Sequence, residues 1–103
     1  MRKYSKLVRD KVPEIIQKSG KTAITHIAIN EEYWIALCDK LREEAEEFAE
    51  NPSKEEYADL AEVMNAIRAF KDWNIPDTEN VTFSKRLERG GFEQRIILDS
   101  ISD

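Results

Sequence analysis

The chain of 103 residues has little of several residue types, and each shortage excludes a class of protein. Its single cysteine, Cys38, excludes an internal disulfide and a zinc site built from several thiolates. Its single histidine, His26, excludes a di-iron bundle, which needs two Glu-x-x-His pairs. Three glycines and three prolines leave no flexible linker or low-complexity segment. Any site chemistry must therefore rest mainly on charged side chains.

Long apolar runs are also missing. No stretch approaches the ~20 apolar residues that cross a bilayer, and the basic N-terminus lacks the apolar core of a secretion signal. The sequence therefore predicts a soluble cytoplasmic protein with no membrane partner. With 41% hydrophobic and 36% charged residues, residues 1–103 are expected to form one domain with a modest core. A chain this small often covers its remaining apolar surface by oligomerising.

The net charge of −5 conceals an uneven distribution. Residues 1–21 carry seven Lys or Arg against two acidic residues, whereas residues 31–62 carry three basic against twelve acidic residues. A protein that binds a nucleic-acid polymer is expected to spread positive charge over a face, so no such partner is predicted. A basic arm beside an acidic centre suits a phosphate ligand bridged by a metal ion. The alternative is that these charge runs are solvated helix faces.

Apolar periodicity and capping signals predict an all-α fold. The turn Asn51-Pro52-Ser53 is so short that the helices on either side of it must be antiparallel neighbours. One such pair leaves apolar surface uncovered, so we expect a homodimer or homotetramer with a four-helix core. The first predicted helix has about ten residues, is capped by Asp10 and ends at Gly20. The second begins at its cap Asn30 and ends at about Glu50, and the third begins at the capping box Ser53-x-x-Glu56 and ends at about Trp73. A short fourth helix is predicted from about Asn80 to Glu88, before Gly90-Gly91.

Two apolar segments lie outside these helices. Residues 22–29, TAITHIAI, contain no charged side chain and are rich in β-branched residues, and the tail 92–98, FEQRIIL, ends in a similar run. This composition favours extended backbone, so the two segments are candidates for a small two-stranded β element.

The helix predicted over 30–50 carries its glutamates at unequal distances from its apolar stripe. On a wheel at about 100° per residue, Glu43 and Glu46 lie opposite the stripe, where water satisfies them. Glu44 lies at the edge of the stripe and Glu47 one step further round, on adjacent turns, so both side chains can reach one point. The stripe consists of Trp34, Leu37, Cys38, Leu41, Ala45 and Phe48.

The next helix directs carboxylates inward more strongly. Glu56 falls inside its stripe and Asp59 at the border, although Glu56 alternatively bends back to its own cap. An unpaired buried carboxylate costs on the order of several kcal/mol, and Lys40, Arg42 and Lys54 are too few to neutralise four of them. Oxygen ligands without histidine favour Mg²⁺ or Mn²⁺ over zinc or iron. The stripe consists of Tyr57, Leu60, Val63, Met64, Ile67 and Phe70.

The same carboxylates form a recognisable motif. Glu43-Glu44-x-x-Glu47 followed by Glu56-x-x-Asp59 resembles the EExxE…ExxD signature of the all-α NTP pyrophosphohydrolases, the MazG-like proteins related to phosphoribosyl-ATP pyrophosphatase. ExxE alone is a common helix pattern, whereas two inward pairs with matching flanks are more specific. The spacer of eight residues between the two halves is shorter than is typical of longer MazG-like proteins.

Both ends of the chain extend the resemblance. The opening 6-KLVRDKVPEII-16 and the ending 89-RGGFEQRIIL-98 are similar to a small subgroup regarded as house-cleaning enzymes for noncanonical nucleotides. The resemblance implies a helical bundle completed by oligomerisation. It also implies Mg²⁺-dependent cleavage of a nucleoside triphosphate between the α and β phosphates, which gives a monophosphate and pyrophosphate.

Carried over by position, the resemblance implies four metal ligands, and the chemistry of the reaction adds candidates for the other roles. The metal ligands are Glu44, Glu47, Glu56 and Asp59. The catalytic candidates are Glu43, Glu44 and Glu47, with Glu43 or Glu47 accepting the proton of the attacking water. Candidates for phosphate binding are Lys6, Arg9, Lys11, Lys85 and Arg89, each of which alternatively forms a surface salt bridge. Trp34 or Phe83 is a candidate wall for the base, and each is alternatively a core residue.

Two other functions remain open. The first is a non-enzymatic helical adaptor that dimerises through the two stripes, its four carboxylates paired with basic groups or water. The second is hydrolysis of another metabolite with a pyrophosphate bond, such as a nucleotide sugar or a phosphoribosyl compound. The metal and phosphate half of the site would look the same in that case.

Overall fold

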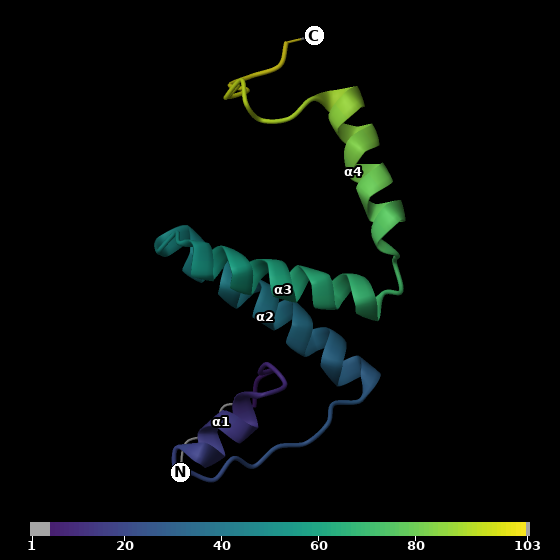
Figure 1. Ribbon diagram of the computed structural model, residues 1–103. Helices are drawn as coiled ribbons and strands as arrows, with labels where there is room; N and C mark the ends of the chain where they lie inside the picture. The colour runs from purple at the N-terminus through teal and green to yellow at the C-terminus, as the bar shows by residue number, and fades with distance from the viewer. Residues whose placement is uncertain (1–4, 103) are drawn as a thin grey trace. The chain divides into compact units, whose positions relative to one another are not determined.

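The computed structural model describes residues 5–102 and confirms an all-α fold. Four helices follow one another: α1 (Val12–Lys18), α2 (Asn30–Glu50), α3 (Lys54–Phe70) and α4 (Ile75–Arg89) (Figure 1). Residues 5–102 contain no β-strand. Across that same range, no helix is long and apolar enough to cross a membrane.

The chain divides into two compact units, Met1–Lys71 and Asp72–Asp103. The first contains α1, α2 and α3, and the second contains α4. The expectation of a single domain over residues 1–103 stays a prediction. All of the carboxylates in the motif lie in the first unit.

The helices α2 and α3 form an antiparallel pair joined by a short turn (Figure 1). Phe48 meets Tyr57 edge-on beside the turn, with ring centroids 6.0 Å apart. At the far end of the pair, Trp34 stacks on Phe70 with centroids 6.1 Å apart. These two contacts fix the direction and the register of the hairpin.

The core of the first unit lies between these two helices. Leu37 of α2 is 1% exposed, and Val63 and Ile67 of α3 are also buried. Six half-buried side chains pack around this centre. Leu7 is one of them, so the N-terminal segment also contacts the helix pair. The six are Leu7, Tyr33, Trp34, Leu41, Ala66 and Phe70.

Only part of each predicted stripe is covered. Ala45, Tyr57 and Met64 belong to the predicted stripes but are exposed. The reason is geometric, since one helix packed against one partner covers only a strip of its surface. The outer part of both stripes is left for a further element or a second chain.

Several predicted helix boundaries need correction. Asp10 does not cap α1, whose cap is Lys11 with no side-chain hydrogen bond, and Asn30 is the first residue of α2 rather than its cap. The helix α3 ends at Phe70 and not at Trp73, because Asp72 adopts a left-handed backbone conformation with φ of 59°. Ser53 caps α3 as predicted, its hydroxyl accepting a hydrogen bond from the Glu56 amide at 3.1 Å.

The last helix begins earlier than predicted, at Ile75 and not at Asn80. Asn74 caps it, because its side-chain oxygen accepts a hydrogen bond from the Asp77 amide at 2.8 Å. Pro76 occupies the first turn, where a missing amide proton costs nothing, so it stands at the start of a helix. The helix ends at Gly90 as predicted, with a φ of 84° that glycine adopts without strain.

The predicted two-stranded β element is wrong for the described residues. Residues 22–29 and 92–98 both lie outside regular secondary structure. β-branched side chains favour strands mainly by packing on a neighbour, and here they have none: Ile27 is 94% exposed. The composition favoured extended backbone without providing a partner strand.

Candidate metal centre

Five carboxylates gather at the end of the hairpin near its turn. Glu43, Glu44 and Glu47 form one group of oxygen atoms within 4.8 Å of one another. Glu44, Glu56 and Asp59 form a second group with the same spacing. Glu44 belongs to both groups, so the cluster joins α2 to α3.

Helix spacing and hairpin register together produce this cluster. Each pair, Glu44 with Glu47 and Glu56 with Asp59, is separated by three residues and so occupies one face on adjacent turns. The register that places Phe48 beside Tyr57 also places the last two turns of α2 beside the first two turns of α3. All four carboxylates therefore meet at one end of the pair.

Two of these carboxylates carry oxygen atoms without a partner. Glu44 is 7% exposed, and its Oε2 accepts no hydrogen bond from residues 5–102. The Oε2 atom of the half-buried Glu56 is likewise shielded and unpartnered within the described chain. A buried oxygen of this kind loses its hydration without compensation, so it marks a place where a ligand fits.

The electrostatics of the cluster follow from this burial. Burial raises the pKa of Glu44, and the neighbouring charge of Glu47 raises it further. Burial also raises the pKa of Glu56, followed by the charges of Glu47 and Asp59. The Glu56 carboxyl additionally hydrogen-bonds to the Glu47 carboxyl, which again favours its protonated form.

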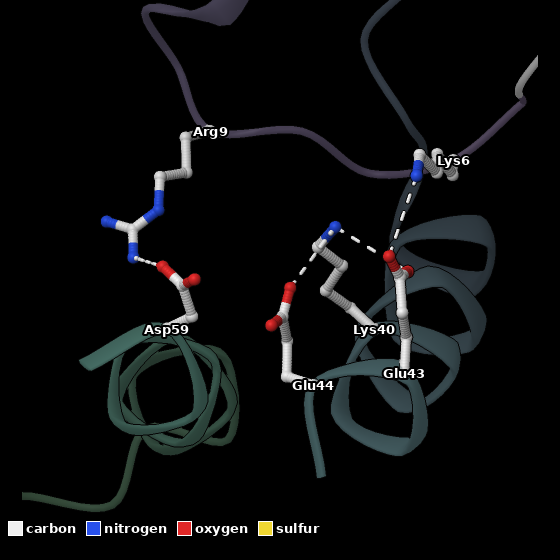
Figure 2. Close-up of polar contacts among 6 residues, drawn as sticks. All are labelled: Lys6, Arg9, Lys40, Glu43, Glu44 and Asp59. Atoms are coloured by element: carbon white, nitrogen blue, oxygen red, sulfur yellow. Dashed lines mark hydrogen bonds and ion pairs between the residues drawn. The ribbon is translucent and has the colours of Figure 1, made fainter. Parts of the chain in front are cut away.

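Three basic side chains border the cluster (Figure 2). Arg9 Nη2 lies 2.8 Å from Asp59 Oδ1, and Lys6 Nζ lies 3.5 Å from Glu43 Oε1. Lys40 Nζ lies 3.6 Å from both Glu43 Oε2 and Glu44 Oε1. In Figure 2, Glu44 and Asp59 project from their helices toward the segment that carries Lys6 and Arg9.

The donor set and the charge fit a hard divalent cation. Five carboxylates against three basic side chains leave an excess of two negative charges when all are ionised. The two unpartnered oxygens, of Glu44 and Glu56, come from facing helices. Carboxylate oxygens without nitrogen or sulfur ligands suit Mg²⁺ or Mn²⁺.

One assignment from the helical wheel is wrong. Glu43 was expected to face water, yet it is half-buried between Lys6 and Lys40. A wheel compares residues only with their own helix, and here Lys6 of the N-terminal segment and Lys40 of α2 both lie beside Glu43. Lys40 was missed as a site residue, although its spacing of three and four from Glu43 and Glu44 is the available signal.

The remaining candidates differ in their exposure. Lys11 is exposed at the start of α1, and Lys85 and Arg89 are exposed on α4 in the second unit, so their phosphate binding stays a prediction. Trp34 is a half-buried core residue stacked on Phe70. Phe83 is 62% exposed and borders a hollow of about 300 Å³ on α4 alone.

A pocket of about 410 Å³ adjoins the cluster on the α2 side. It shares Lys6, Lys40 and Glu43 with the cluster, so it opens directly beside the carboxylates. Its further lining combines apolar and acidic side chains. These are Ser5, Ile29, Glu31, Glu32, Ile35, Ala36 and Asp39.

Comparison with known proteins gives one partial match. An uncharacterised protein of Mycolicibacterium smegmatis is 46% identical over 43 residues, which cover 42% of this chain and 44% of that protein. The matched part is thus less than half of the relative's length. No family model and no solved structure matches the chain.

Proposed function

We propose that the protein is a Mg²⁺-dependent nucleoside triphosphate pyrophosphohydrolase that yields a monophosphate and pyrophosphate. The observation that carries the proposal is the pair of shielded, unpartnered oxygens on Glu44 and Glu56, two residues that come from neighbouring helices and share one carboxylate group with Asp59 beside a basic segment. Mn²⁺ is the alternative cation. The resemblance of the carboxylate motif to MazG-like enzymes supplies the reaction class.

In this proposal, some of the carboxylates bind the cation and another accepts a proton. Glu44, Glu56 and Asp59 would hold the cation between α2 and α3, and Glu47 adjoins them through its contact with Glu56. A divalent cation bound there would engage phosphate oxygens and lower the pKa of a water molecule. Removing the proton from that water is then the task of a carboxylate.

The geometry favours Glu47 over Glu43 as the acceptor of that proton. Glu43 lies within 3.6 Å of both Lys6 and Lys40, so its carboxylate is already engaged in two ion pairs. Glu47 is exposed and forms no ion pair within residues 5–102. Its carboxyl can therefore approach an attacking water without first leaving a cation.

The basic segment supplies the phosphate contacts in this proposal. A triphosphate brings about four negative charges, which an acidic cluster alone would repel. Arg9 offers a planar, bidentate donor, and Lys6 offers a mobile ammonium on the same side of the cluster (Figure 2). The adjoining pocket of about 410 Å³ is wide enough for the nucleoside part.

We further propose that the active form is a homodimer or homotetramer with a four-helix core. Ile35, Tyr57 and Met64 expose large apolar surfaces on α2 and α3, and a second hairpin would cover them. Light scattering at micromolar concentration is expected to give at least twice the monomer mass of 12.0 kDa. A monomer under these conditions contradicts the four-helix core.

The reaction is tested with ordinary and modified nucleoside triphosphates and Mg²⁺, scored for pyrophosphate release. A positive substrate is then hydrolysed in ¹⁸O-labelled water. Label is expected in the monophosphate, because water attacks the α phosphorus and pyrophosphate leaves. Label only in pyrophosphate or orthophosphate contradicts this mechanism.

A negative result divides the alternatives. Pyrophosphate-bond cleavage of nucleotide sugars or phosphoribosyl compounds, with no triphosphate turnover, moves the activity to that substrate class. Absence of turnover on every substrate, together with no binding of Mg²⁺ or Mn²⁺ by calorimetry, favours the helical adaptor.

A further inference from the structure

The contact between Arg9 and Asp59 joins the two parts of the candidate site that have opposite charge. Arg9 Nη2 donates a hydrogen bond to Asp59 Oδ1 at 2.8 Å, across 50 residues of sequence. Asp59 is also one of the three residues whose oxygens lie within 4.8 Å of one another with Glu44 and Glu56. The guanidinium group therefore occupies a carboxylate that a cation at this cluster would need.

Arg9 and a divalent cation cannot both bind the Asp59 carboxylate without repelling each other. A guanidinium held at 2.8 Å from Asp59 would lie a few ångströms from the cation, where like charges repel. The Arg9 side chain is 56% exposed, and Arg9 lies in a non-helical segment, so its side chain can turn away from Asp59 without disturbing the core. When Arg9 turns away, it loses its charge-assisted hydrogen bond to Asp59, and this loss is compensated only if another anion accepts a hydrogen bond from the guanidinium group.

A polyphosphate is the anion that suits this exchange. Guanidinium groups bind phosphate oxygens in a bidentate manner, which matches what Arg9 would lose at Asp59. Lys6, also on this segment, lies 3.5 Å from Glu43 and faces the same side of the cluster (Figure 2). A ligand that brings the cation and several phosphates together satisfies both the carboxylates and the arginine.

We propose that Arg9 exchanges partners, holding Asp59 in the empty site and a phosphate in the filled one. The site therefore selects a complex of a divalent cation with a polyphosphate over the cation alone. This inference rests on the proposed function and identifies the chemical form of its ligand. Arg9 acts as the positioning residue that couples the binding of cation and phosphate.

The exchange predicts effects of opposite sign from a single substitution. Arg9→Ala is expected to tighten binding of Mn²⁺ alone about two- to fivefold, because the competing guanidinium is gone. The same substitution is expected to weaken binding of magnesium tripolyphosphate about 10- to 100-fold, because a charged hydrogen bond to phosphate is lost. Tripolyphosphate carries the phosphate chain without a base, so base preference does not affect the result.

Calorimetry on the full chain measures both affinities, with tripolyphosphate titrated in excess Mg²⁺. Lys21→Ala is the control, because it removes one positive charge from an exposed residue that forms no ion pair in the described chain. Any change in Mn²⁺ affinity common to both variants reflects net charge. Only the excess for Arg9→Ala reports the exchange.

The outcomes separate this inference from the proposed function. If Arg9→Ala binds Mn²⁺ no more tightly than Lys21→Ala does, or binds magnesium tripolyphosphate as tightly as the unaltered chain, the exchange is wrong while the metal centre stands. If the unaltered chain and both variants bind neither Mn²⁺ nor the complex, the proposed function fails as well. Opposite shifts confined to Arg9→Ala support the exchange.

Discussion

Replacing Glu44 by glutamine is expected to raise the melting temperature of the metal-free protein and to lower turnover at least about a hundredfold. The gain in stability arises because the Glu44 carboxylate is 7% exposed and leaves Oε2 without a partner. An amide has nearly the same shape, carries no charge, and can donate to the neighbouring carboxylates of Glu47 or Asp59. Turnover falls because an amide oxygen is a poor substitute for a carboxylate that is shared by both groups of the cluster.

The stability gain should depend on pH in a defined direction. Since folding raises the pKa of Glu44 above its ordinary value of 4.5, the folded state binds more protons than the unfolded state above that pH. The unaltered protein therefore loses stability as pH rises from 4.5 through the raised pKa, whereas Glu44→Gln lacks this contribution to the loss. The difference between the two melting temperatures should be small near pH 4.5 and should grow as the pH rises through the raised pKa.

Melting curves in the presence of a chelator, and initial rates with Mg²⁺, measure the two effects. Glu46→Gln is the matched control, since Glu46 is exposed on the same helix and lies outside both carboxylate groups. It should change neither property appreciably. A Glu44→Gln variant that keeps full turnover removes Glu44 from the metal centre. A variant that melts earlier than the unaltered chain without metal contradicts the cost assigned to its unpartnered oxygen.

The part of the site that could be predicted from the sequence depends on local geometry. Glu44 and Glu47, or Glu56 and Asp59, share a face because a helix repeats about every 3.6 residues, whatever surrounds it. The short Asn51-Pro52-Ser53 turn then determines that the two faces meet. Periodicity and turn length are both readable from one sequence, so the amino-acid sequence alone is enough to predict that these four carboxylates meet.

The basic half of the site depends on contacts that periodicity does not encode. Arg9 reaches Asp59 across 50 positions, and the segment that carries it has no regular structure. The same segment brings Lys6 to Glu43 and removes that glutamate from open water. Composition predicted a basic arm near an acidic centre, but only tertiary structure shows which arginine meets which carboxylate.

The errors in the fold have a similar cause. Residues 22–29 have β-branched composition, and a strand also needs a neighbour to complete its hydrogen bonds. The sequence carries the preference and not the partner. The start predicted for α4 is too late because the capping signal of Asn74, followed by Pro76 in the first turn, was missed.

Leu37→Ala is expected to lower the free energy of unfolding by about 2–5 kcal/mol, a large share of what a small domain has. Leu37 is 1% exposed and is the one buried apolar side chain that α2 contributes to the core, opposite Val63 and Ile67 of α3. Few neighbours are available to collapse into the space left behind. Urea unfolding at a fixed protein concentration measures the loss. Ile35→Ala is the companion variant on the same helix, because Ile35 is 62% exposed in the single chain and its loss costs stability only where a second chain covers it.

The same substitution tests whether the core supports the metal centre. Leu37 precedes Glu44 by two turns on α2, so loosening its contact with α3 should spread the carboxylates of the two helices and weaken cation binding. A cation that joins α2 to α3 binds only the folded hairpin, so saturating Mg²⁺ should recover part of the lost stability. Equal losses from Leu37→Ala and Ile35→Ala would mean that the outer face is as well covered as the core, which places a second chain over Ile35. If Leu37→Ala loses the expected stability and saturating Mg²⁺ recovers none of it, the cation is not held jointly by α2 and α3. A ligand held by both helices must oppose their separation.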